Sequence, residues 1–211
     1  MDDDAQRAQH ATAAAAVRRL GHALIARSIE PELLGEITAQ LDDLSARVEA
    51  AESRTRLPNS SRSFYEPPTK DSPAAHKNLF AESIISGDLN ALGVAAELWR
   101  EGDVAVMEAT LGPAFEGVPG RSHGGIVAAM VDETMGIVLA IHNEAAYTGR
   151  LTVTYRAGTP VGVPVTCRCW LTERQGRKLL MRGEVRHGEL LCAEAEAVFI
   201  TVDPVAFAEA E

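Results

Sequence analysis

Two adjacent carboxylates stand in a stretch of sequence that is otherwise suited only to a protein core. Asp132 and Glu133 interrupt residues 124–143, where apolar side chains occur on nearly every side of a predicted helix, the pattern of a buried helix. Burying an ionised carboxylate without partners is costly, so each acid must either reach the surface or be held for a purpose. We expect the longer Glu133 to reach solvent at the edge of the helix, and Asp132 to be functional.

The start of the same helix carries a second chemical signal. Gly124 and Gly125 follow His123 directly, and consecutive glycines let a ligand approach the backbone closely. The first N–H groups of a helix lack intrahelical acceptors and attract negative charge, so they would suit the oxyanion formed when a thioester carbonyl is attacked. His123 has two interpretations, a base or a cap of the first N–H groups, and we favour the cap.

Strands must hold this helix in place, and the sequence predicts them on both sides of it. Alternating apolar residues indicate half-buried strands at 105–111, 151–157, 163–171, 179–185 and 191–199, with a less regular candidate at 92–99. Glycine-containing turns separate the later strands, which favours antiparallel hairpins. One buried helix within such a set predicts an α+β hotdog fold, in which an antiparallel sheet wraps around a central helix.

The chain before the strands differs in composition. Residues 1–53 repeat apolar side chains at helical spacing and predict a helical hairpin that breaks at 28–31, before Pro31. Residues 54–77 are rich in Pro and Ser and predict a linker, which leaves 78–211 as the hotdog domain. Because the strand and helix pattern is complete without the first 77 residues, we expect these residues to be an accessory segment. Their removal should leave the activity of the hotdog domain intact.

The motifs together resemble the PaaI-like group of hotdog-fold acyl-CoA thioesterases. The resemblance rests on His123-Gly124-Gly125, six residues, then Asp132, with a preceding Phe-Glu-Gly-x-Pro-Gly loop, Tyr147-Thr148 and a Gly-Arg-Lys turn at 176–178. It implies that Asp132 is the general base or nucleophile, that the Gly124 N–H polarises the thioester carbonyl, and that the Thr148 hydroxyl helps to hold water.

The resemblance also implies a substrate. Arg177 and Lys178 would bind the phosphates of coenzyme A, with Gly125 allowing the ligand to approach, and Arg150 and Arg156 are weaker candidates. Coenzyme A is part of the substrate, so no separate cofactor is expected. Some members of the family place Asn or Gln in the loop before the helix as a second oxyanion donor, where this chain has Gly117 or Val118.

Composition narrows the alternatives. A formal net charge of −10 disfavours nucleic acid as a partner, and no apolar run reaches the ~18 residues of a membrane span. The three cysteines, Cys167, Cys169 and Cys192, suggest a reducing, cytoplasmic compartment and core positions rather than a metal site. Two other functions remain open: a catalytically idle module that binds an acyl-CoA or a partner, and a hydratase using His142 or His187.

Spacing also predicts the assembly. Gly124 and Asp132 are eight residues apart, which separates them by about 12 Å along a helix axis. They cannot both contact one thioester. We therefore expect a homodimer, possibly paired into a homotetramer, in which Gly124 of one chain lies beside Asp132 of the other.

Overall fold

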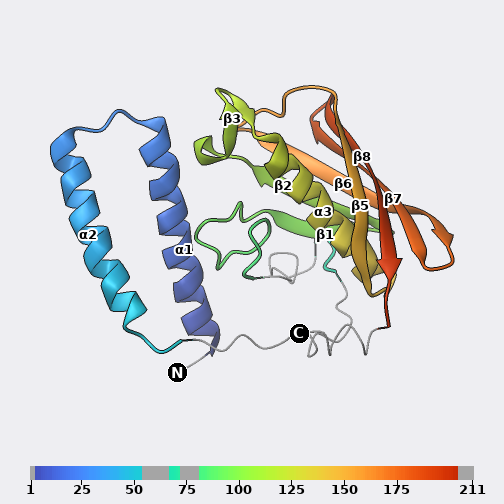
Figure 1. Ribbon diagram of the computed structural model, residues 1–211, viewed down its shortest axis with the longest axis horizontal. Helices are drawn as coiled ribbons and strands as arrows, with labels where there is room; N and C mark the ends of the chain where they lie inside the picture. Colours follow the sequence, from blue (N-terminus) through green and yellow to red (C-terminus); the bar gives the residue numbers. More distant parts are fainter. Residues whose placement is uncertain (1–2, 54–66, 72–80, 204–211) are drawn as a thin grey trace.

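The main domain is a curved antiparallel sheet with one helix packed against it (Figure 1). The computed structural model describes residues 3–53, 67–71 and 81–203. Six strands lie in the order β1-β2-β6-β7-β8-β5, with the bounds β1 (Glu97–Glu101), β2 (Val104–Thr110), β5 (Ala146–Tyr155), β6 (Pro164–Gln175), β7 (Lys178–His187) and β8 (Leu190–Thr201). The predicted α+β hotdog architecture is confirmed.

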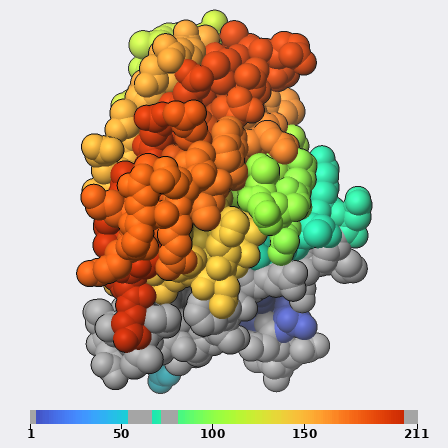
Figure 2. Space-filling model, turned by 90° about the vertical axis from the view of Figure 1, so that its right-hand side faces the viewer, coloured from blue at the N-terminus to red at the C-terminus, as the bar shows by residue number. Residues whose placement is uncertain are grey.

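The two faces of the sheet differ as the alternation predicted. On the inner face Val165, Cys167 and Cys169 are fully buried. The outer face carries charged side chains that pair across strands, for example Arg182 with Glu196 at 2.8 Å. Figure 2 looks onto the side of the molecule formed largely by the later strands, coloured orange to red. The outer face is therefore a solvated surface of paired charges, and the core lies between the sheet and the helix.

Helix α3 (Gly124–Ile141) supplies the other half of the core. Its side chains that pack against the sheet are buried: Val127, Met130, Val131, Thr134, Met135, Ile137, Val138 and Leu139. With 18 residues and a mean hydropathy of 1.7, α3 is long and apolar enough to cross a membrane by length and composition alone. Asp132 and Glu133 interrupt its apolar run, and its packing against the sheet is that of a core helix.

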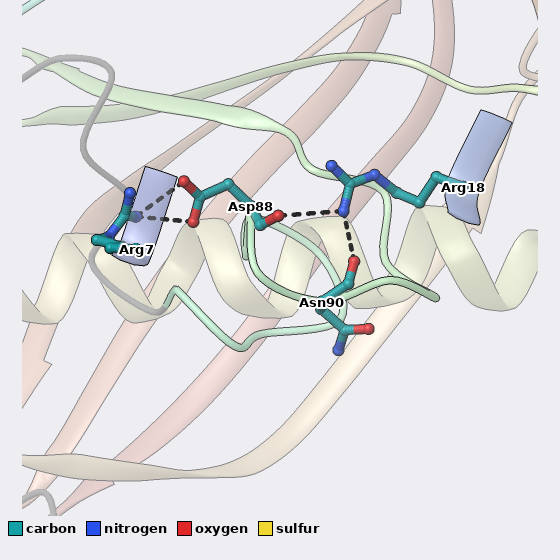
Figure 3. A network of polar contacts seen from close by, with 4 residues as sticks. All are labelled: Arg7, Arg18, Asp88 and Asn90. Carbon is teal, nitrogen blue, oxygen red and sulfur yellow. Dashed lines mark hydrogen bonds and ion pairs between the residues drawn. The ribbon is translucent and has the colours of Figure 1, made fainter. Parts of the chain in front are cut away.

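The N-terminal hairpin has the predicted break, and its two helices differ in their contacts. Helix α1 (Asp3–Ala26) is anchored to the main domain: Arg7 pairs with Asp88 at 2.8 Å, and the Arg18 guanidinium donates to the carbonyl oxygens of Asp88 and Asn90 (Figure 3). Helix α2 (Pro31–Glu49) has no buried residue. Its apolar residues at 3,4 spacing are largely exposed, namely Leu34, Leu41, Leu44 and Val48.

Two predicted boundaries fall mostly outside the described residues. Of the predicted linker 54–77 the structure describes 67–71, where the Pro68 carbonyl accepts the Arg100 N–H of β1 at 2.8 Å. The predicted start of the hotdog domain at residue 78 is not described. Between β2 and α3 the chain forms a short helix η2 (Pro113–Phe115) and a small hairpin of β3 (Glu116–Val118) and β4 (Arg121–Ser122), which sequence patterns did not predict.

Candidate active site

Asp132 and Thr148 come from different elements and form one hydrogen bond. Asp132 lies in the middle of α3, and Thr148 lies near the start of β5, which runs back along the helix after the turn at 142–145. The Thr148 hydroxyl donates to Asp132 Oδ1 at 2.9 Å. Asp132 is half-buried and Thr148 is exposed. A carboxylate on the core helix is thus held by a hydroxyl at a place that water and a substrate can reach.

The helix begins at His123, and its side chain is a cap. Its Nδ1 accepts the Gly125 N–H at 3.0 Å, and its carbonyl accepts the Ile126 N–H at 3.0 Å. The interpretation of His123 as a cap is confirmed, and Gly125 has its N–H occupied by the ring. Gly124 holds the first helical position, where the N–H has no acceptor within the helix.

Tyr155 closes over Gly124 from β5, a contact that sequence reasoning missed. Its hydroxyl donates to the Gly124 carbonyl at 2.7 Å. A Cβ at residue 124 would lie 3.1 Å from the Tyr155 oxygen, tighter than ordinary contact. A side chain at 124 would therefore push the tyrosine away, which explains a glycine here. The only sequence signal was the position of Tyr155 at the end of an alternating strand.

Within one chain, Gly124 and Asp132 contact opposite ends of β5. Gly124 contacts Tyr155 at the end of β5, while Asp132 contacts Thr148 near its start. Because α3 is continuous from Gly124 to Ile141, the rise of 1.5 Å per residue separates Gly124 from Asp132 by about 12 Å along the axis. A single chain does not bring the two predicted groups to one point.

Glu133 is only partly exposed, and hydrogen bonds hold its carboxylate instead of leaving it free in solvent as expected. Its carboxylate accepts the hydroxyls of Ser83 and Ser86 and, at 3.1 Å, the Ser86 N–H. Ser86 is fully buried. The prediction missed these partners because the segment before β1, which no periodic pattern marked, folds over α3 and supplies hydrogen-bond donors. Glu133 therefore fastens that segment to the helix, while its neighbour Asp132 faces β5.

The predicted cations lie at the same end of the sheet as Thr148. Lys178 is aligned with Ile200, and Ile200 with Tyr147, so two strand spacings of about 5 Å each separate Lys178 from the residue before Thr148. Lys178 is exposed. Arg177 donates to the Thr201 carbonyl at 3.0 and 3.2 Å, so this guanidinium also fastens the end of β8.

The remaining candidates have structural explanations. Burial raises the pKa of the Cys169 thiol, and the neighbouring Cys167 sulfur adds to the rise, so these thiols are core groups as predicted. No cluster of His, Cys, Asp and Glu suited to a metal occurs among the residues that the structure describes. His187 contacts the Pro164 carbonyl at 2.8 Å, and His142 caps the far end of α3, about 15 Å beyond Asp132 along the axis. Arg156 pairs with Glu194 at 2.6 Å.

Comparison with known proteins finds a family model that matches part of the chain. Residues 120–196, which include α3, β5, β6, β7 and more than half of β8, match the model of the thioesterase superfamily. This part of the chain is therefore similar to the thioesterase superfamily, and the resemblance drawn from the His-Gly-Gly motif is confirmed at that level.

Relatives and a solved structure extend the comparison. Acyl-coenzyme A thioesterase THEM4 of Xenopus laevis is 35% identical over 95 residues, which are 44% of this chain and 43% of that protein. THEM5 of Mus musculus is 30% identical over 91 residues, 42% of this chain and 37% of that protein. The chain thus matches less than half the length of these relatives. The crystal structure of a thioesterase superfamily protein is similar in fold, with a TM-score of 0.76, 24% identity and 90% of each chain covered.

Proposed function

We propose that this protein is an acyl-CoA thioesterase, which hydrolyses an acyl-CoA thioester to the free acid and coenzyme A. The observation that carries the proposal is the hydrogen bond from Thr148 to Asp132 at 2.9 Å, which holds a carboxylate at an accessible point of an otherwise apolar helix. A module that only binds its ligand has no need of a base there. The names of the relatives THEM4 and THEM5, both acyl-coenzyme A thioesterases, support the same activity.

Asp132 acts in one of two ways that the carboxylate allows. As a general base it takes a proton from water, the hydroxide attacks the thioester carbonyl, the carbon–sulfur bond breaks, and the proton returns to the leaving thiolate. As a nucleophile it forms a mixed anhydride with release of the thiolate, and water then cleaves the anhydride. In both routes negative charge develops on the carbonyl oxygen, which the Gly124 N–H stabilises. Thr148 orients the Asp132 carboxylate.

Lys178 is the better candidate of the two cations for the phosphates of coenzyme A. Its side chain is exposed at the end of the sheet where Thr148 lies, and an ammonium binds phosphate as a mobile point charge. Arg177 already donates to the Thr201 carbonyl, so it must keep or exchange that bond to bind a phosphate. The three free thiols, Cys167, Cys169 and Cys192, support a reducing compartment such as the cytoplasm.

The proposed enzyme is a homodimer with two shared sites. The separation of Gly124 from Asp132 requires a second chain to complete each site. Two surfaces support the pairing: β5 bonds to β8 along one edge and has no strand partner on the other among the described residues, and an unpaired edge is a template for association. Beside it, one turn beyond Asp132 on α3, a Cβ at Gly136 would meet nothing within 4 Å.

The activity is tested by thiol release. Wild type and Asp132→Asn are assayed with short, medium, long and aromatic acyl-CoAs, with free coenzyme A detected by a thiol reagent. We expect turnover by wild type, and a loss of kcat of at least about 100-fold in the variant, the scale for removal of a positioned base. Absence of turnover with every acyl-CoA, together with tight binding of acyl-CoA, would instead identify an idle binding module.

The shared site is tested by complementation. Gly124→Pro removes the donor N–H at a position where the start of a helix accepts proline, and it also brings a Cβ against Tyr155. Asp132→Asn removes the base. Each homodimer should be nearly inactive. Refolding the two variants together places both lesions in one site of each heterodimer and leaves the other intact, so random pairing restores roughly a quarter of wild-type activity per total protein. Demonstrated heterodimers without recovery would place the whole site in one chain.

A further inference from the structure

We propose that His22 of α1 is a positioning residue for the oxyanion end of the active site, an inference that rests on the proposed role of the Gly124 N–H. The sequence marked α1 as part of an accessory hairpin. In the structure, its imidazole reaches the segment that leads into α3. The first helix of the chain thereby takes part in fixing the N-terminus of the helix that carries the chemistry.

The contact of His22 is specific in both hydrogen bonding and shape. Its Nδ1 accepts the Ala114 N–H at 3.1 Å, and its ring meets the Phe115 ring edge-on with centroids 5.2 Å apart. The ring also lies directly on Gly112, where a Cβ would come within 2.5–2.9 Å of three imidazole atoms. Only a glycine at 112 leaves room for the imidazole, so the His22 ring packs closely on the backbone of Gly112.

The segment held by His22 determines where α3 begins. Ala114 and Phe115 belong to η2, and the Phe115 carbonyl accepts the His123 N–H at 2.8 Å. His123 is the cap of α3, and the next residue is Gly124, whose N–H is the proposed oxyanion donor. A path of two hydrogen bonds and two peptide bonds therefore runs from the imidazole through Ala114, Phe115 and His123 to the donor.

The other contacts of α1 attach it to a different segment, so the contact of His22 with η2 is not needed to hold α1 on the main domain. Arg7 and Arg18 bind Asp88 and Asn90 in the segment before β1 (Figure 3), away from η2. Loss of the His22 side chain therefore leaves α1 attached and removes the support of η2 alone. An oxyanion donor must lie within a few tenths of an ångström of its ideal place, because a transition-state hydrogen bond weakens steeply with distance and angle.

The experiment compares three variants with a matched control. His22→Ala removes acceptor and ring, and His22→Asn retains an acceptor oxygen near the place of Nδ1. Gly112→Ala drives a methyl group into the imidazole. The control is Gly21→Ala, beside His22 on α1, where a Cβ meets nothing within 4 Å and alanine favours the helix. Each is measured as kcat and KM for one acyl-CoA, with melting temperature and dimer content.

We expect His22→Ala to lower kcat roughly tenfold, part of the 100-fold or more that loss of a whole oxyanion donor costs, with KM within about twofold of wild type. His22→Asn should recover most of kcat, and Gly21→Ala should equal wild type. Gly112→Ala should lower kcat when His22 is present and have no added effect in the His22→Ala background, since the clashing ring is gone. A wild-type kcat in folded, dimeric His22→Ala overturns the proposal. So does an equal loss of kcat in His22→Ala and His22→Asn that follows a loss of melting temperature, because such a loss reflects stability alone.

A second measurement separates this proposal from the proposed function. Backbone amide resonances of His123, Gly124 and Gly125 are compared between wild type and His22→Ala by NMR. The path of contacts predicts that these signals shift in His22→Ala and stay in place in Gly21→Ala, whether or not the protein hydrolyses any acyl-CoA. Shifted amides with no turnover in wild type would refute the thioesterase assignment alone, whereas unmoved amides would refute the role of His22.

Discussion

The two adjacent acids of α3 give the sharpest test of the site, because their partners differ completely. Asp132 accepts one hydroxyl, that of Thr148, and faces the open side of β5. Glu133 accepts the hydroxyls of Ser83 and Ser86 and the Ser86 N–H. We predict that Asp132→Asn abolishes turnover and keeps stability, and that Glu133→Gln keeps turnover and loses stability.

The size of the stability loss follows from the hydrogen bonds. A bond to a charged group is worth about 1.5–3 kcal/mol and a neutral one about 0.5–1.5 kcal/mol, so neutralising an acceptor of three bonds would cost about 3–4.5 kcal/mol. The partial exposure of Glu133 reduces this to about 2 kcal/mol. For a domain of this size, that loss lowers the melting temperature by about 4–8 °C. Asn at 132 keeps an oxygen for the Thr148 hydroxyl, so its melting temperature should stay within about 2 °C of wild type.

The assay is run well below both melting temperatures, so that every variant is folded when turnover is measured. Thiol release gives kcat, and thermal unfolding followed by circular dichroism gives the melting temperature. Near-normal turnover by Asp132→Asn combined with an inactive Glu133→Gln would show that Glu133, and not Asp132, carries the chemistry. An inactive Glu133→Gln of unchanged stability would refute the role of Glu133 as a fastening for residues 83–86.

Three further outcomes are expected. Replacing Arg177 and Lys178 together by Ala should raise KM for acyl-CoA much more than for a thioester without the nucleotide, and equal effects would make them surface charges only. Burial, and secondarily Arg18, lowers the pKa of His22 in the folded protein. The contribution of the neutral imidazole to stability is therefore complete above pH ~6.5 and is lost as the pH falls through the folded pKa. Stability should depend less on pH in His22→Asn, and equal acid sensitivity of the two proteins would contradict this prediction. Gly136→Leu should leave the monomer folded but block pairing, measured by light scattering, and an intact dimer would place the interface elsewhere.

Sequence periodicity was sufficient for the sheet and the central helix because burial repeats along each element. Cys167, Cys169 and the other inward residues of the strands follow period two, and the break of the N-terminal hairpin followed from Pro31. The spacing of Thr148 from Asp132 became a contact because the turn after α3 returns the chain along the helix. The strand before β2 was placed only approximately, since residues 92–96 precede the strand that begins at Glu97.

The contacts that sequence patterns missed join residues that are far apart in sequence. Ser83 and Ser86 lie in irregular chain before β1, and their bonds to Glu133 depend on where that chain folds. Tyr155 differs from any exposed strand residue only because α3 places Gly124 beneath it. No rule of spacing connects residues so far apart in sequence. Glu133, beside the proposed catalytic acid, was therefore assigned to solvent although Ser83 and Ser86 donate to it.

The same reasoning changes the expectation for the N-terminal hairpin, which sequence analysis treated as one accessory unit. Helix α2 has no buried residue, so deleting residues 31–49 should leave kcat and melting temperature near their wild-type values. Helix α1 binds the main domain through Arg7, Arg18 and His22, and a protein lacking residues 1–26 loses all three anchors. We expect that protein to unfold at lower temperature and to turn over more slowly than the α2 deletion. Full activity and stability after removal of α1 would restore the original prediction of a dispensable hairpin.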